Sequence, residues 1–386
     1  MLRRQLLIGF AGYLLVGTGA VLAPSLMPAI TAEFTAVGLS LAVIGLLAPA
    51  ASAGRIAGTL LAGYGSDRLG RQRLVWLTAL LLAAALALTA GAMHWLLFVL
   101  GYVVVGLVQG ALSTGINAMI ADAAHEARAR ALNMLHGVYG LGAALSPVVI
   151  GALVGAGLPW RWTMAGVGGL WLLYGLVTQR LARGEASETQ AQAAQQWRLA
   201  MLLERPFLAL FLVAFIYNGI ASSLLNWVAL YTQALGGFSA LGSVSMVALF
   251  YVGLTAGRFI CAALAERLGY GRTFLALALG VLATYPLVVL GAQPLTVSAG
   301  VFGAGLSLSG LFPTALADAA RRYPGQTGAV TGTLTVALTL GSIIPPAWTG
   351  VLADAAGLQV ALGVNYALAL LLLGLARYLW RRPSAA

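Results

Sequence analysis

The chain carries very little charge. Asp, Glu, Lys and Arg make up 8% of its 386 residues, whereas soluble domains carry about 25%. Hydrophobic residues account for 61% of the chain, and the mean hydropathy is +0.93. This composition excludes a soluble globular domain and predicts a protein that crosses a membrane many times.

Cysteine and metal-ligand clusters are also scarce. Cys261 is the single cysteine, so no disulfide can form within the chain. No group of Cys, His and acidic residues has the spacing of a metal site, and no glycine-rich loop follows a strand as a nucleotide site requires. Intramembrane hydrolysis would need an acid within a span to orient His136, and no span contains one. The sequence therefore predicts no metal, no cofactor and no enzymatic activity.

Lysine is absent, and all 21 basic residues are arginines. With the N-terminus in the cytoplasm, 18 of the 21 fall on the cytoplasmic side, Arg161 falls outside, and Arg55 and Arg258 lie within the membrane. This distribution follows the positive-inside rule and predicts a multi-pass protein of the cytoplasmic (inner) membrane with both termini cytoplasmic. It also accounts for the net charge of +11, so nucleic-acid binding is not expected.

Apolar runs of about 20 residues have the length that crosses a bilayer as a helix. The first run lacks a small-residue cleavage site, so we expect it to be a span rather than a removable signal peptide. Twelve such runs predict an all-α membrane protein with twelve transmembrane helices, at 6–30, 39–62, 74–93, 96–120, 132–154, 162–180, 207–231, 241–264, 273–292, 295–317, 327–350 and 357–379.

The twelve spans repeat as two halves of six. A shift of 199 residues places Arg68-Leu69-Gly70 on Arg267-Leu268-Gly269. Such a parallel repeat is typical of transporters whose halves are related by an axis along the membrane normal. The predicted organisation is an N-terminal six-helix bundle at 1–180, a polar cytoplasmic linker at 181–206 and a C-terminal six-helix bundle at 207–386.

The loop between the second and third spans carries the most specific motif. Residues 63–73 resemble the signature of the major facilitator superfamily, in which a glycine is followed four residues later by Asp and then by Arg-x-Gly-Arg. The resemblance covers the whole chain and implies two pseudo-symmetric bundles that work by alternating access. A carboxylate at a helix end can hold arginines and a neighbouring helix terminus. The expected conformational latch comprises Gly63, Asp67, Arg68, Gly70, Arg71, Glu266 and Arg267; the alternative is a loop that only sets topology.

Some stretches resemble particular groups of the superfamily. Residues 131–136 resemble the fucose permease and sugar-type group. The chain departs from that group, in which acidic residues are expected in spans 1, 4 and 7. Those positions fall near Ala23, Ser113 and Ala221 in this chain, where no acid is present. A symporter driven by carboxylate protonation is therefore not expected. The chain also departs from drug/proton antiporters, since Gly106 stands where they carry an arginine.

Two arginines lie inside apolar spans, Arg55 in the second and Arg258 in the eighth. A charge at membrane depth is costly, and it usually faces a partner or a water-filled path. Arg258 resembles the anion-binding arginine of oxalate:formate exchangers, monocarboxylate transporters and nitrate porters, and Arg55 lies one turn before the corresponding position, Thr59. No acid within a span can neutralise either arginine, so we expect both to bind an anion, which guanidinium groups match bidentately. The alternatives are bonds from Arg258 to neighbouring carbonyls and snorkelling of Arg55 towards the cytoplasm.

Other polar and aromatic side chains within the spans are candidates for the same path. His136 lies well inside the membrane and could exchange protons near neutral pH. Gln109, Ser113 and Asn117 recur every four residues and form a stripe on one face of the fourth span. For buried amides, bonds between helices are the alternative role. Besides the two arginines, the predicted substrate-binding residues are His136, Gln109, Asn117, Asn218, Asn226, Trp227, Tyr139 and Tyr251.

These observations predict a secondary active or facilitative transporter that moves a small organic anion, a carboxylate, by alternating access. Exchange, uniport, or proton coupling through His136 or the substrate's own carboxylate would drive it. The alternatives are a neutral polar solute such as a sugar, with structural arginines, and drug efflux. A receptor would need an output domain, for which twelve spans leave little chain. The expected partners of a monomeric transporter are its small-molecule substrate, a co-transported or exchanged proton or anion, and the lipid bilayer.

Overall fold

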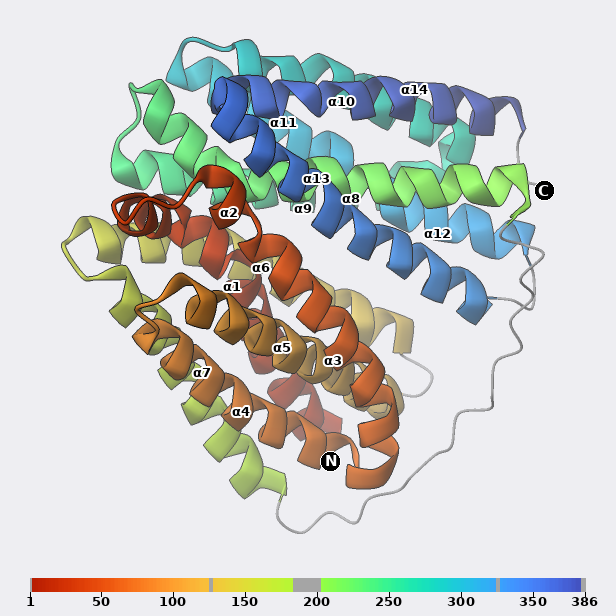
Figure 1. The fold of residues 1–386 in the computed structure, drawn as a ribbon. Coiled ribbons are helices and arrows are strands. Elements are labelled where there is room, and N and C mark those ends of the chain that lie inside the picture. The colour runs from red at the N-terminus through yellow and green to blue at the C-terminus, as the bar shows by residue number, and fades with distance from the viewer. Residues whose placement is uncertain (1, 125–127, 183–202, 324–326, 383–386) are drawn as a thin grey trace. The chain divides into compact units, whose positions relative to one another are not determined.

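The computed structural model describes residues 2–124, 128–182, 203–323 and 327–382, which are helical apart from short turns (Figure 1). The first group of helices is α1 (Leu2–Thr35), α2 (Leu41–Gly45), α3 (Leu47–Leu69), α4 (Arg71–Gly91), α5 (Trp95–Ala124), α6 (Arg128–Gly155) and α7 (Trp160–Ala182). The second group is α8 (Arg205–Leu235), α9 (Ala240–Leu268), α10 (Tyr270–Leu290), α11 (Pro294–Leu308), α12 (Leu311–Arg322), α13 (Thr327–Val364) and α14 (Tyr366–Arg381).

All twelve predicted spans fall on these helices. Within the described ranges, ten stretches are long and apolar enough to cross a membrane. One of them, Gly332–Arg381, covers most of the eleventh predicted span and all of the twelfth. The chain turns between these two spans at Gly357, which has a φ of 81°. The sixth predicted span, 162–180, is not among the ten and corresponds to α7.

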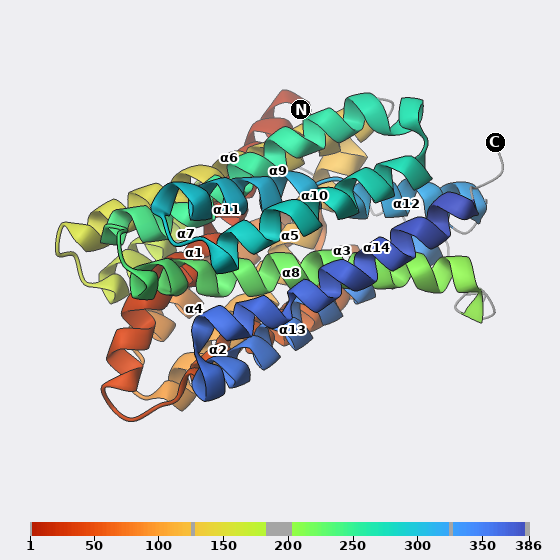
Figure 2. The same ribbon diagram turned by 90° about the horizontal axis from the view of Figure 1, so that it is seen from above.

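Contacts divide the chain into two units, which are treated separately below. Unit 1 contains α1 and α3 to α7, and unit 2 contains α8 to α14 together with Leu39–Leu46, the segment that includes α2. The strongest helix pairs of unit 1 are α3 with α5, α4 with α7 and α1 with α6. The equivalent pairs recur in unit 2 as α9 with α11, α10 with α14 and α8 with α13 (Figures 1 and 2). Most of the predicted linker, 181–206, lies outside the described residues.

Glycines let the paired helices approach backbone to backbone, and they do so at the same shift of 199 residues. A Cβ on Gly54 of α3 would lie 2.1 Å from the carbonyl oxygen of Val103, and a Cβ on Gly253 of α9 would lie 2.2 Å from that of Phe302. Both distances are too short for any side chain, so both positions require glycine. The reverse contacts obey the same shift and involve Gly106 with Ala51 and Gly305 with Phe250.

Glycine also closes the turn that follows the second helix of each repeat. Gly70 adopts φ 80° and ψ 149°, and Gly269 adopts φ 82° and ψ 145°. A positive φ is readily available only to glycine. The Arg-Leu-Gly sequence shared by the two halves therefore ends each helix with the same backbone turn.

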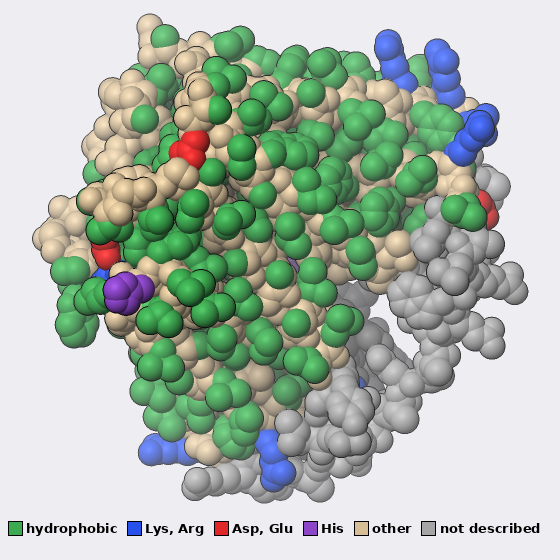
Figure 3. All heavy atoms as spheres, viewed as in Figure 1, with side chains coloured by type: hydrophobic (Ala, Val, Ile, Leu, Met, Phe, Trp, Pro, Cys, Tyr) green, Lys and Arg blue, Asp and Glu red, His purple; other side chains and the backbone are tan. Residues whose placement is uncertain are grey.

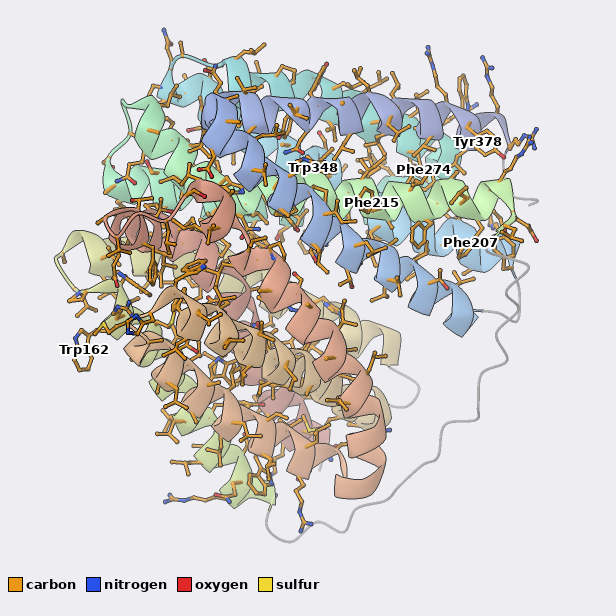
Figure 4. The ribbon with its side chains drawn as sticks, in the orientation of Figure 1. Trp162, Phe207, Phe215, Phe274, Trp348 and Tyr378 are labelled. Atoms are coloured by element: carbon orange, nitrogen blue, oxygen red, sulfur yellow. The ribbon has the colours of Figure 1, made fainter. Side chains whose placement is uncertain are left out.

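The outer surface is largely apolar. On the face seen in Figure 3, hydrophobic side chains cover the helices and arginines lie where helices end. Trp162 is 69% exposed and points away from α7 (Figure 4). Exposure of large apolar side chains over such an area fits a surface that lipid covers.

Arg161, the arginine expected outside the membrane, is neutralised within unit 1. Its guanidinium pairs with the Glu33 carboxylate, and it donates to the carbonyls of Ala90 and Ala92 at 2.8 and 2.7 Å. The indole of Trp160 donates to the same carboxylate at 2.8 Å. The group therefore ties together α1, the end of α4 and the start of α7.

Three predicted spans contain a one- or two-residue irregularity, at which the backbone keeps right-handed helical dihedral angles. It lies at Leu46 in the second span, at Ser309 and Gly310 in the tenth, and at Asn365 in the twelfth. The Asn365 side chain is buried, accepts from the indole of Trp348 at 2.8 Å, and donates to Thr349 at 3.1 Å (Figure 4). These bonds hold the start of α14 against the middle of α13.

Candidate substrate-binding site

Arg55 projects from α3 and has a neutral partner. Its guanidinium donates to Oε1 of Gln109 on α5 at 3.3 Å. Gln109 is 5% exposed, and its Nε2 donates to the Val16 carbonyl of α1 at 3.4 Å. Gly19 leaves room for this amide, since a Cβ there would lie 2.6 Å from Nε2. Gln109 thus links three helices while Arg55 itself stays exposed.

Tyr13 of α1 joins the polar stripe that was predicted on α5. Its hydroxyl lies 3.0 Å from the Ser113 hydroxyl and accepts from Nδ2 of Asn117, which also donates to the Ser113 carbonyl at 2.9 Å. Tyr13 was not among the predicted residues. The signal for Tyr13 was a hydroxyl-bearing ring inside an apolar span, where the hydroxyl needs a partner.

Two residues of α6 complete this cluster. The His136 ring meets the Tyr13 ring edge to face, with centroids 5.4 Å apart, and the Tyr139 centroid lies 6.3 Å from that of Tyr13. His136 is exposed. Unit 1 therefore brings Asn117, His136 and Tyr139 together around Tyr13. Gln109, which pairs with Arg55, is one turn before Ser113 on the same helix, α5.

Arg258 on α9 of unit 2 differs from Arg55. Its Nε is buried and has no hydrogen-bond partner in the described part of the chain. The preceding residue, Gly257, packs closely on α11, because a Cβ there would lie 2.4 Å from the Leu306 carbonyl oxygen. Arg258 is therefore a membrane-embedded cation whose donors are not all satisfied.

Arg55 and Arg258 do not occupy equivalent positions of the 199-residue repeat, since they differ by one helical turn. A Cβ on Gly58 would meet the Leu107 carbonyl oxygen at 1.7 Å, which is the counterpart of the Gly257 contact at the 199-residue shift. That shift places Arg258 on Thr59 and leaves Arg55 four residues earlier. Residues four apart share a helix face, so each arginine belongs to the same face of its own helix at a different height.

The remaining predicted residues lie on α8 and α9. The amides of Asn218 and Asn226 donate to the backbone carbonyls of Leu338 and Ser222, at 2.6 and 2.7 Å. Trp227 is 1% exposed and Tyr251 is 8% exposed. Asn218, Asn226 and Trp227 make no hydrogen bond with one another, unlike the cluster of unit 1.

Comparison with known proteins identifies the family. A sequence profile described as Major Facilitator Superfamily matches residues 9–344. The chain belongs to the major facilitator superfamily. It is 22% identical to the uncharacterized MFS-type transporter YfkL of Bacillus subtilis (strain 168), over 97% of this chain and 95% of the relative.

Solved structures of major facilitator transporters share its fold. A point mutant of the nucleoside transporter NupG matches with a TM-score of 0.82 and 12% identity, over 98% of this chain and 100% of that one. A bacterial homologue of the human lysosomal transporter Spinster, in an inward-facing and occupied conformation, matches with a TM-score of 0.79 and 16% identity, over 98% and 96%. The predicted all-α transporter fold is confirmed, and the protein is a membrane transporter rather than an enzyme.

The superfamily signature lies at the end of α3 and the start of α4. Four latch positions fall where the side chains lie outside the described part of the structure: Gly63, Asp67, Arg68 and Glu266. Gly70 forms the positive-φ turn, Arg71 begins α4, and Arg267 is exposed in the last turn of α9. The latch itself stays a prediction.

Proposed function

We propose that this transporter carries a small organic anion, a carboxylate, and that Arg55 and Arg258 each contribute positive charge to its binding. The observation that carries the proposal is the buried Nε of Arg258, which has no partner among the described residues. A buried unsatisfied donor costs about 1–3 kcal/mol, and more when it is charged. An anion that accepts from this guanidinium would remove that cost.

Arg55 supports the same conclusion. Its hydrogen-bond partner, Gln109, carries no charge. The ion pairs between described side chains join Arg161 with Glu33 and Arg322 with Asp318, and both lie at helix ends. The charge of Arg55 is therefore available to a ligand, and a guanidinium presents paired donors that match a carboxylate.

The polar residues around Tyr13 would orient the substrate and could couple its transport to protons. Asn117 and Tyr139 provide polar groups beside Tyr13, and His136 is exposed at the same cluster. Protons could enter the cycle through His136 or through the substrate's own carboxylate; exchange and uniport fit the same residues. The distribution of arginines supports the cytoplasmic membrane as location, with both termini cytoplasmic.

A neutral polar solute is the second candidate. The hydroxyl and amide bonds among Tyr13, Ser113 and Asn117 are of the kind that recognise sugar hydroxyls, and one similar structure is a nucleoside transporter. In that case Arg55 and Gln109 would brace three helices, and Arg258 would be structural.

A thermal-shift measurement on the purified protein separates the two candidates. A ligand that binds the folded state stabilises it by RT ln(1 + c/Kd), where c is the ligand concentration, and this is about 2.7 kcal/mol when c is 100 Kd. We expect small mono- or dicarboxylates to raise the melting temperature and neutral sugars to leave it unchanged. Arg258→Gln and Arg55→Gln should abolish the shift, whereas Arg272→Gln, at an exposed site near the start of α10, should retain it. Stabilisation by sugars alone, retained in the first two variants, would favour the neutral solute.

A further inference from the structure

The start of α10 and the ends of α12 and α14 meet at one corner of unit 2. A Cβ on Gly271, the second residue of α10, would lie 2.7 Å from Cα of Trp380 on α14. The guanidinium of Arg322, the last residue of α12, donates to the carbonyl of Arg382 at 2.7 Å. Three helices that are far apart in the sequence therefore bring their terminal residues together (Figure 1), on the side that the arginine distribution predicts to be cytoplasmic.

Arginines are concentrated at this corner, and Figure 3 shows arginine side chains gathered at the same end of the molecule. The exposed ones are Arg272, Arg321, Arg377, Arg381 and Arg382. Arg322 pairs with the buried carboxylate of Asp318 at 3.1 Å. The other described acid at this end, Glu204, accepts from the Tyr323 hydroxyl at 3.0 Å. Among the described side chains, the corner therefore carries a large excess of positive charge.

Tyrosine rings position two of these arginines. The guanidinium carbon of Arg321 lies 5.4 Å from the centroid of the Tyr270 ring, and that of Arg382 lies 5.4 Å from the centroid of the Tyr378 ring (Figure 4). The face of an aromatic ring attracts a cation, and a guanidinium has five N–H donors that it can present to an anion. Two of the exposed charges are therefore held in place before any ligand binds.

The repeat shows that membrane topology alone does not require this corner. Helices α4 and α10 begin at Arg71 and Tyr270, and α7 and α14 end at Ala182 and Arg381, so both pairs match at the 199-residue shift. The last five residues of α14 contain two arginines, a tyrosine and a tryptophan, whereas those of α7 contain one arginine and no aromatic residue. The positive-inside rule applies to both bundles, so the additional arginines and rings of unit 2 need another explanation.

The surface next to the corner can accept acyl chains. Leu370 and Leu371 of α14 are 55% and 49% exposed, and Trp380, nearer the end of the same helix, is 46% exposed. Tryptophan and tyrosine favour the boundary between the apolar core of a bilayer and its headgroups. Along α14, exposed leucines are thus followed by aromatic residues and then by arginines, which is the order in which a phospholipid presents its chains, its interfacial region and its phosphate.

We propose that the corner formed by the start of α10 and the ends of α12 and α14 binds an anionic phospholipid. Its phosphate is held by the exposed arginines, Arg321 and Arg382 among them, and its acyl chains lie along α14. Phosphate oxygens match the paired donors of a guanidinium, and basic surfaces on the cytoplasmic side of membrane proteins attract anionic headgroups. The site lies at helix ends and is independent of which solute is carried.

Native mass spectrometry of the full-length protein in a neutral detergent tests this, once the lipids that co-purify have been removed. Phosphatidylglycerol and phosphatidylcholine with identical acyl chains are titrated separately, and the bound lipid molecules are counted. We expect phosphatidylglycerol to bind with a Kd about tenfold lower, because the choline group of the other lipid offsets the charge of its phosphate. Glycerol phosphate, which has the phosphate but no acyl chain, should bind far more weakly than phosphatidylglycerol.

Arg321→Gln combined with Arg382→Gln should raise the Kd of phosphatidylglycerol about 30-fold, because each arginine beside an anionic headgroup contributes about fivefold, equivalent to about 1 kcal/mol. Arg321→Lys combined with Arg382→Lys keeps both charges and should lose much less. The matched control is Arg180→Gln, at an exposed arginine in the last turn of α7, which should leave the Kd unchanged. Equal affinity for the two lipids, equal affinity for glycerol phosphate, no change in the double glutamine variant, or an equal loss in Arg180→Gln would each overturn the proposal.

Discussion

A negative charge introduced next to Arg55 would distinguish an Arg55 that binds an anion from an Arg55 that has only a structural role. Gln109→Glu would place a carboxylate where an amide oxygen now lies 3.3 Å from the Arg55 guanidinium. At an effective dielectric constant of 20, two unit charges at that separation attract by about 5 kcal/mol. Arg55 is exposed, so solvent screening and desolvation of the new carboxylate reduce the net gain to about 0.5–1 kcal/mol. A bound anion would have to compete with this pair.

Anion affinity should therefore fall by about 2- to 5-fold in Gln109→Glu, since 1.4 kcal/mol corresponds to a factor of ten. Titration calorimetry or thermal shift with the carboxylate that stabilises the parent protein measures the change. Gln109→Met is the matched control: it removes the same hydrogen bond without adding charge and should lower affinity much less. Equal losses in the two variants, or none in Gln109→Glu, would refute a binding role for the charge of Arg55.

Two further predictions concern stability. Gly58→Ala places a methyl group against a carbonyl oxygen and should cost about 1–3 kcal/mol. Gly137→Ala, where a Cβ meets nothing within 4 Å, should keep or slightly raise the melting temperature, because alanine favours a helix over glycine; equal melting temperatures in the two variants would contradict the packing argument. Arg161→Ala leaves the Glu33 carboxylate unpaired and should also cost about 1–3 kcal/mol. Arg161→Lys should recover part of that loss in thermal denaturation.

The helices and their repeat could be predicted because membrane-spanning helices obey local rules. Apolar length located the predicted spans, and all but the sixth fall within stretches of the described structure that are long and apolar enough to cross a membrane. The 199-residue shift, first visible in the Arg-Leu-Gly turns, recurs as matching glycine contacts at Gly54 and Gly253. Irregularities within spans could not be predicted, because they depend on distant partners. Asn365 interrupts the twelfth span through bonds to Trp348 and Thr349 of α13, and nothing in the hydropathy of that span marks it.

The residues of the candidate site were partly predictable. Four-residue spacing identified the stripe of Gln109, Ser113 and Asn117, because one face of a helix is a property of its own sequence. Tyr13 was missed because its importance comes from other helices, which meet its hydroxyl and ring. In unit 2, Asn218 and Asn226 bond backbone carbonyls. Bonds of this kind, between helices or within one helix, are the alternative to ligand binding that the sequence leaves open for buried amides.

The cap at the start of the second span could not be predicted from its own sequence. The amides of Leu41 and Ala42 are among the first of the helix and have no partner within it. A carboxylate more than 300 residues away, that of Asp354, accepts hydrogen bonds from both. Asp354 is one of only ten acidic residues in the chain. A local pattern such as hydropathy therefore locates the span, whereas the group that caps it depends on a helix that is far away in the sequence.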